Sequence, residues 1–139
     1  MKTEQLTIGS EGNDMIIDHN KIKDCTQFKY LGVIITKEGN SNEDIDNKII
    51  QGTKAIGKLN SVLWNDKINL KTKKMIFSTI VESIVTYGSE TWGINRINEK
   101  RLKALEMDYW RRACGVSRLE HVRNNEGQES REARTSWTQ

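Results

Sequence analysis

Hydrophobic positions in the first 40 residues occur in short runs separated by turn-forming residues. The runs lie at residues 6–8, 15–17 and 28–35, and Gly, Ser, Asn and Asp gather between them. Short apolar runs bounded by such residues predict β-strands joined by tight turns. Apolar and polar residues do not alternate cleanly over 28–35, which indicates a strand buried on both faces. We therefore expect a small antiparallel hairpin region within residues 1–40.

After residue 41 the hydrophobic period changes to that of a helix. Apolar or small residues recur every three or four positions, at Ile45, Ile49, Gly52, Ile56, Leu59 and Leu63. This narrow stripe predicts a helix over residues 42–64 that packs against neighbours. Ser41 and Asp44 resemble a capping box at its start. Gly52 falls on the stripe, where a close approach of another helix would offset glycine's cost of about 1 kcal/mol.

Two more helices are predicted, over residues 70–87 and 98–114, with Asn69 as a cap for the first and Gly115 as a stop for the second. The residues expected to be buried are Leu70, Phe77, Ile80, Val81 and Ile84 in one helix, and Leu102, Leu105, Tyr109 and Ala113 in the other. The sequence then becomes polar, and residues 118–139 are expected to be disordered. The predicted fold is α+β, with a β region at 1–40 and a three-helix bundle at 41–117.

Charge is distributed unevenly along the chain. Residues 1–50 carry six Lys/Arg against nine Asp/Glu, and residues 51–139 carry sixteen against ten. A basic C-terminal part suits a polyanionic partner, although a solvated helical surface explains so small an excess equally well. Lys71, Lys73 and Lys74 stand in the first turns of the predicted second helix, where the helix dipole favours acids. Their position is compatible either with phosphate binding or with simple solvation.

The common catalytic and metal-binding motifs are absent from the sequence. It contains no GxxxxGK[ST], GxGxxG, HExxH or CxxC pattern. His19 and His121 stand in polar segments, and Cys25 and Cys114 are far apart, which favours two reduced thiols. No apolar run approaches the roughly 20 residues that span a bilayer. We expect an intracellular protein, cytoplasmic or nuclear, with no membrane association, no catalytic residues and no metal site.

Three segments in order carry a resemblance to a known family. They are FKYLG at residues 28–32, YGSETW at 87–92 and WRRACGVSR at 110–118. In this order and spacing they resemble the C-terminal part of the reverse transcriptase domain of non-long-terminal-repeat (LINE-type) retrotransposons, over residues 2–125. Lys2-Thr3 resembles the family's end of the palm. The resemblance implies that FKYLG belongs to the primer-grip hairpin and that the helices form the thumb and its extension.

The resemblance also supplies candidate binding residues and a partner. A template–primer duplex of RNA and DNA would contact Lys29, Tyr30 and Gly32 of the grip-like segment and the lysines of the second helix, Lys71, Lys73 and Lys74. Lys29 is expected to meet phosphate, because phosphate contacts dominate nucleic-acid affinity. Tyr30 is expected rather to lie in the core.

Catalysis is not expected of this chain. The family holds its metal ions with an aromatic-x-Asp-Asp motif, and the sequence has no Asp-Asp dipeptide. The resemblance implies that those aspartates, and the Mg²⁺ of the parent enzyme, belong to an upstream polymerase segment, so no cofactor is expected here. The alternative is a helical protein-interaction fragment, or a decayed product without selected activity.

The chain departs from the family's pattern in its lack of proline. It contains none, and the family usually has one where Ser83 stands. Proline kinks a helix because it removes a backbone donor and clashes with the preceding turn. Its loss is expected to straighten the second helix.

Overall fold

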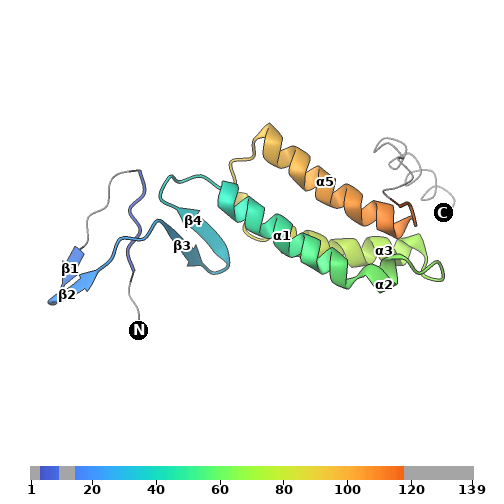
Figure 1. Ribbon diagram of the computed structural model, residues 1–139, viewed down its shortest axis with the longest axis horizontal. Coiled ribbons are helices and arrows are strands. Elements are labelled where there is room, and N and C mark those ends of the chain that lie inside the picture. Colours follow the sequence, from blue (N-terminus) through green and yellow to red (C-terminus); the bar gives the residue numbers. More distant parts are fainter. Residues whose placement is uncertain (1–3, 10–14, 118–139) are drawn as a thin grey trace. The chain divides into compact units, whose positions relative to one another are not determined.

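The computed structural model describes residues 4–9 and 15–117 (Figure 1). Its fold is α+β, as predicted: two small antiparallel hairpins precede the helices. The chain divides into two compact units, Met1–Asn47 with Gly88–Ile94, and Lys48–Tyr87 with Asn95–Gln139. The predicted disordered tail, 118–139, lies outside the described residues, as do Lys2, Thr3 and Arg118 of the family resemblance.

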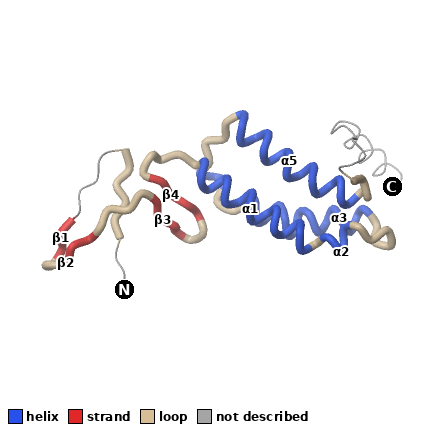
Figure 2. Tube along the Cα trace, viewed as in Figure 1, coloured by secondary structure: helices blue, strands red, loops and turns tan. Residues whose placement is uncertain are grey.

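The first unit contains both hairpins (Figure 2). Strand β1 (Met15–Ile17) pairs with β2 (Asn20–Ile22), and β3 (Gln27–Tyr30) pairs with β4 (Val33–Thr36). The predicted single strand over 28–35 is therefore wrong, because the chain reverses within it. The strand predicted at 6–8 is also wrong. The segment next to it makes one isolated bridge, between Gln5 and Asp24.

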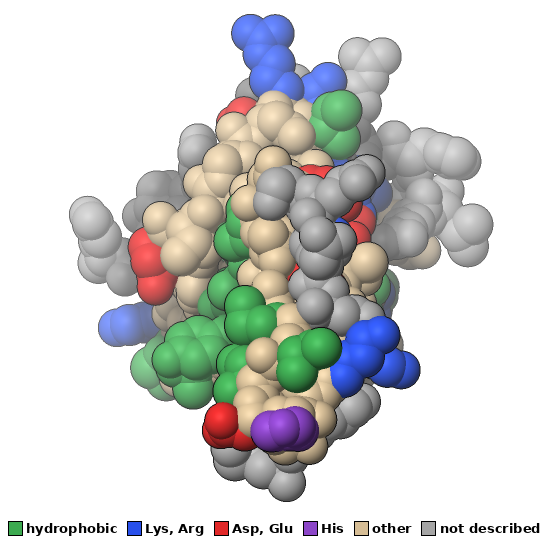
Figure 3. Space-filling view, turned by 90° about the vertical axis from the view of Figure 1, so that its left-hand side faces the viewer, with side chains coloured by type: hydrophobic (Ala, Val, Ile, Leu, Met, Phe, Trp, Pro, Cys, Tyr) green, Lys and Arg blue, Asp and Glu red, His purple; other side chains and the backbone are tan. Residues whose placement is uncertain are grey.

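Hairpin β1–β2 is exposed and apolar. Met15, Ile16 and Ile17 are all exposed, and hydrophobic side chains lie on this part of the surface in Figure 3. Asp18 and His19 form its turn, with φ of 48° and 66°. A two-stranded hairpin is marginally stable by itself in water. These three apolar side chains therefore add little to the stability of the first unit.

The predicted helices are present with altered boundaries. The helical elements are α1 (Asn42–Lys58), α2 (Asn60–Leu63), α3 (Leu70–Ile76), the π-helix η1 (Phe77–Glu82), α4 (Ser83–Thr86), the 3₁₀-helix η2 (Ser89–Thr91) and α5 (Arg96–Ala113). The helix expected over 42–64 is interrupted at Leu59, and the one expected over 70–87 contains a π-helical stretch. The second helix is thus not a regular α-helix, although it lacks the proline that the family usually has where Ser83 stands.

The ends of the helices are capped by side chains and glycine as the sequence suggests. The Asn69 side chain accepts the backbone N–H of Thr72 at 2.8 Å. At the end of α5, Gly115 has a φ of 71° and its N–H bonds to the carbonyl of Arg112. The N–H of Val116 bonds to the carbonyl of Arg111, which completes a Schellman motif. The predicted stop at Gly115 is confirmed.

The hydrophobic core lies in the second unit. Its buried residues are Ile56, Leu63, Val81, Val85, Leu105, Tyr109, Trp110 and Ala113. The Phe77 ring packs against Tyr109 and Trp110, with ring centroids 4.8 and 5.5 Å apart. The predicted stripe is confirmed at Ile56 and Leu63 of this core. Ile80, which was expected to be buried, is exposed.

Gly52 of α1 lies where three helices approach one another. A Cβ atom on Gly52 would come within 2.8 Å of a Val85 methyl group and 2.9 Å of a Leu105 methyl group. The close approach expected from its place on the stripe is confirmed. Gly57, further along α1, is in open space, and a Cβ atom there would meet nothing within 4 Å.

The two glycines of α1 should therefore respond oppositely to alanine. Gly57→Ala is expected to raise the free energy of unfolding by about 0.8 kcal/mol, because alanine costs less backbone entropy in a helix. Gly52→Ala gains the same propensity but overpacks the core, a cost of about 1–3 kcal/mol, so its net effect should be destabilising. Urea unfolding of both variants measures the difference. A stabilising Gly52→Ala would mean that Val85 and Leu105 move aside freely.

Candidate nucleic-acid interface

The FKYLG segment forms the tip of hairpin β3–β4. Tyr30 pairs with Val33, so Leu31 and Gly32 alone make the turn. Both have positive φ, 47° and 85°, as a type I′ turn requires. That conformation suits Gly32 but costs a leucine about 1–2 kcal/mol. Leu31 is nevertheless 73% exposed, so burial of its side chain does not offset the cost.

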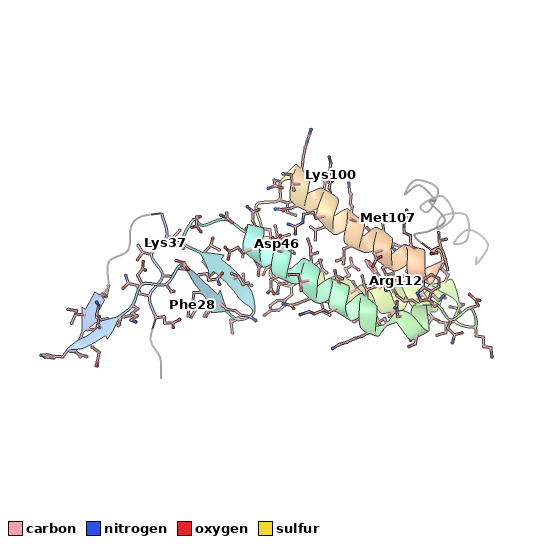
Figure 4. The ribbon with its side chains drawn as sticks, in the orientation of Figure 1. Phe28, Lys37, Asp46, Lys100, Met107 and Arg112 are labelled. Atoms are coloured by element: carbon pink, nitrogen blue, oxygen red, sulfur yellow. The ribbon has the colours of Figure 1, made fainter. Side chains whose placement is uncertain are left out.

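Lys29 and Tyr30 lie on opposite faces of this hairpin, because successive side chains of a strand alternate. Tyr30 is 59% exposed, so its expected place in the core is wrong. Phe28, labelled in Figure 4, shares the face of Tyr30 and is also exposed. Two exposed aromatic rings thus lie on one face and Lys29 on the other. The sequence indicates this pair, because Phe28 and Tyr30 are two residues apart and side chains at that spacing share one face of a strand.

The buried carboxylate of Asp44 holds this hairpin and the YGSETW segment to the start of α1. One carboxylate oxygen accepts the backbone N–H of Ile34 at 2.9 Å, and the other accepts Nε1–H of Trp92 at 2.8 Å. Asp44 is only 1% exposed. It is therefore not the reciprocal partner in a capping box that the sequence suggested. The side chain is committed to two donors from other segments.

Gly88 and Ser41 extend the contacts of the YGSETW segment. Gly88 has a φ of 79°, and a Cβ atom there would lie 2.6 Å from a methyl group of Val33. The Ser41 hydroxyl donates to the carbonyl of Thr91 and accepts the N–H of Gly93, each at 3.3 Å. The FKYLG segment and residues 88–92 of the YGSETW segment, more than 50 residues apart in the sequence, thus belong to one compact unit.

The lysines of α3 do not form the cluster that the sequence suggested. Lys71 and Lys74 are exposed, but Lys73 is only 4% exposed. The Lys73 ammonium donates to the carbonyls of Leu63 at 2.7 Å and Ala113 at 2.8 Å. Both expectations for Lys73, phosphate binding and solvation, are therefore wrong.

The bonds of Lys73 explain why a lysine occupies this turn of α3. Leu63 and Ala113 are the last residues of α2 and α5. The last carbonyls of a helix lack intrahelical partners and carry the negative end of its dipole. The Tyr109 hydroxyl in turn donates to the carbonyl of Lys73 at 2.6 Å. Burial raises the pKa of Tyr109 to about 12, so the phenol remains a donor at neutral pH.

The third family-like segment, WRRACGVSR, includes the C-terminal end of α5 and contributes buried side chains to the core. Trp110 is buried against Phe77. Arg112, labelled in Figure 4, bonds to Asp108 one turn earlier and donates to Asn60 at 2.6 Å. These contacts give Arg112 a structural role within the second unit.

A shallow hollow of about 270 Å³ lies in the second unit. It is lined by Lys48, Gln51, Ser83, Ile84 and Tyr87. The Lys48 side chain is buried, and its ammonium lies 4.8 Å from the centroid of the Tyr87 ring. A side chain only 3% exposed gives this charge little access to solvent, and the ring attracts the cation without removing its charge. We therefore do not count Lys48 among the surface cations.

The chain matches no protein-family model, curated protein or solved structure. Within residues 4–9 and 15–117, no three His, Cys, Asp or Glu side chains are grouped to hold a metal ion. In the same part of the chain, no helix has both the length and the apolar character needed to cross a membrane.

Proposed function

We propose that this chain is a non-catalytic fragment of a retrotransposon reverse transcriptase that keeps primer-grip and thumb-like elements able to contact a template–primer duplex. The proposal rests on the three family-like segments. The observation that supports it best is the bonding of the FKYLG hairpin and the YGSETW segment to one carboxylate, that of Asp44. The catalytic aspartates and Mg²⁺ would belong to a separate upstream segment, and the chain would act in the cytoplasm or nucleus.

The exposed candidates for contact belong to two groups. Lys29 and Tyr30 belong to hairpin β3–β4, whose turn contains the half-buried Gly32, and Lys71 and Lys74 belong to α3. An exposed tyrosine offers a ring on which a base can stack, and an exposed lysine offers a charge for phosphate. Lys73 is left out of the proposal because its ammonium is bonded inside the second unit.

The salt dependence of binding to an RNA–DNA duplex tests this proposal. Each phosphate contact contributes close to one unit to the slope of log K against log salt. Lys71→Gln with Lys74→Gln should therefore lower the slope by about two units and weaken binding to all sequences alike. The matched control is Lys54→Gln with Lys58→Gln, which removes the same charge from exposed positions of α1.

Three outcomes separate the alternatives. A smaller slope for the α3 variant alone supports the proposed contact. Equal losses in both variants would assign binding to overall charge. If the unchanged chain shows no binding at low salt, the proposal fails, and the chain is better described as a helical protein-interaction fragment or a decayed product.

A further inference from the structure

The long helix from Leu70 to Thr86 changes its type in the middle. It begins as α3, continues as the π-helix η1 and ends as α4. In a π-helix each N–H bonds to the carbonyl five residues back instead of four. The stretch therefore contains a residue more than an α-helix needs to join the same two ends. Such insertions are rare and are frequently found at functional sites.

The two α-helical parts on either side are anchored to the core separately. In α3, the Lys73 ammonium is bonded to the ends of α2 and α5. In α4, Val85 is buried and lies against Gly52. Each residue of an α-helix turns the next side chain by about 100°. Lys73 and Val85 can both face the core only if the helix between them turns by the right total angle. The π-helix accommodates one residue more than a regular α-helix would need for that angle.

Ser83 closes the junction between η1 and α4. Its backbone N–H bonds to the carbonyl of Ile80, three residues back. Its hydroxyl proton is shared between the carbonyls of Thr79 and Ile80, whose oxygens lie 2.7 and 3.0 Å from Oγ. In a regular α-helix the Ser83 N–H would bond to Thr79. The side chain thus supplies the hydrogen bond that the backbone does not make.

We infer that residues 77–82 are a register-adjusting segment, in which one surplus residue lets α3 and α4 be fixed to the core independently. Removal of one exposed residue from this segment converts it to α-helix and leaves both anchors in place. The carbonyl that stood five residues before a given N–H then stands four residues before it.

Single-residue deletions in the full chain test this inference. Thr79 in η1 and Thr53 in the regular helix α1 are both exposed threonines, and they make a matched pair. The Thr79 deletion should keep one cooperative thermal transition, with a midpoint within about 5 °C of the unchanged chain, a shift of about 1 kcal/mol. The Thr53 deletion should abolish cooperative unfolding, because it turns Ile56 and Leu63 away from the core.

Amide hydrogen exchange gives a second measurement. Exchange at residues 77–83 should slow by about tenfold in the Thr79 deletion, because regular α-helical bonds replace the π-helical ones. The methyl resonances of Val85 should stay unchanged. Equal damage by both deletions would overturn the inference. A folded Thr79 deletion with a changed Val85 environment would also overturn it, because α4 would then have rotated.

Discussion

Replacement of Lys73 by methionine is expected to lower the free energy of unfolding of the second unit by about 3 kcal/mol. Methionine keeps the apolar stem but removes the ammonium that bonds to the carbonyls of Leu63 and Ala113. A buried acceptor left without its donor costs about 1–3 kcal/mol, and two are involved here. Urea unfolding followed by circular dichroism measures the change.

Lys74→Met is the matched control for this prediction. Lys74 is the next residue of α3 and is exposed, so its replacement should change the stability by no more than about 0.5 kcal/mol. A Lys73→Met variant as stable as this control would contradict the account. It would mean that water reaches the two carbonyls and replaces the ammonium.

Asp44→Asn is expected to destabilise the first unit by about 2–3 kcal/mol. The carboxylate accepts two N–H groups, from Ile34 and Trp92, and it is almost fully buried. An asparagine amide has one oxygen and one NH₂ group, so one of the two donors must face another donor. Hydrogen bonds to a charged group contribute about 1.5–3 kcal/mol each. The Ile34 amide should therefore exchange about 30- to 150-fold faster with solvent.

Glu43→Gln provides the control at the neighbouring residue. Glu43 is exposed in the same first turn of α1, so its replacement removes the same charge from the helix dipole. Its effect should stay near 0.5 kcal/mol. Combined with Trp92→Phe, Asp44→Asn should show non-additive effects, since both changes disrupt one hydrogen bond. Strict additivity would indicate that Asp44 does not hold the YGSETW segment.

Hydrophobic spacing predicted the helices well because it reflects burial directly. Ile45, Ile56 and Leu63 follow the intervals of three and four, and all three are completely buried. In the second helix the prediction is confirmed at Val81 but wrong at Ile80. Ile80 was expected to be buried and is exposed, whereas Val85 is buried and was not expected to be. The π-helical stretch explains this error, because it changes the rotation between residues that an α-helical pattern assumes.

The candidate site was less predictable from sequence, because equivalent-looking residues have different environments. Lys71 and Lys73 look equivalent in the sequence. In the structure Lys73 reaches the last carbonyls of α2 and α5, whereas Lys71 is exposed. The turn at Leu31 was missed because leucine seldom adopts a positive φ. The sequence spacing of Ser41 and Asp44 suggested a capping box. Its true donors, Ile34 and Trp92, are brought to it by the tertiary fold.

The division of the chain also constrains the order in which its parts can fold during synthesis. The first unit includes Gly88–Ile94, which the ribosome adds only after most of the helices before α5. The second unit in turn takes half of its buried core from α5, the last helix made: Leu105, Tyr109, Trp110 and Ala113. Domains usually fold as they emerge, from the N-terminus onward. Here both units must wait for distant residues, so the hairpins and the first helices leave the ribosome with their final partners still untranslated.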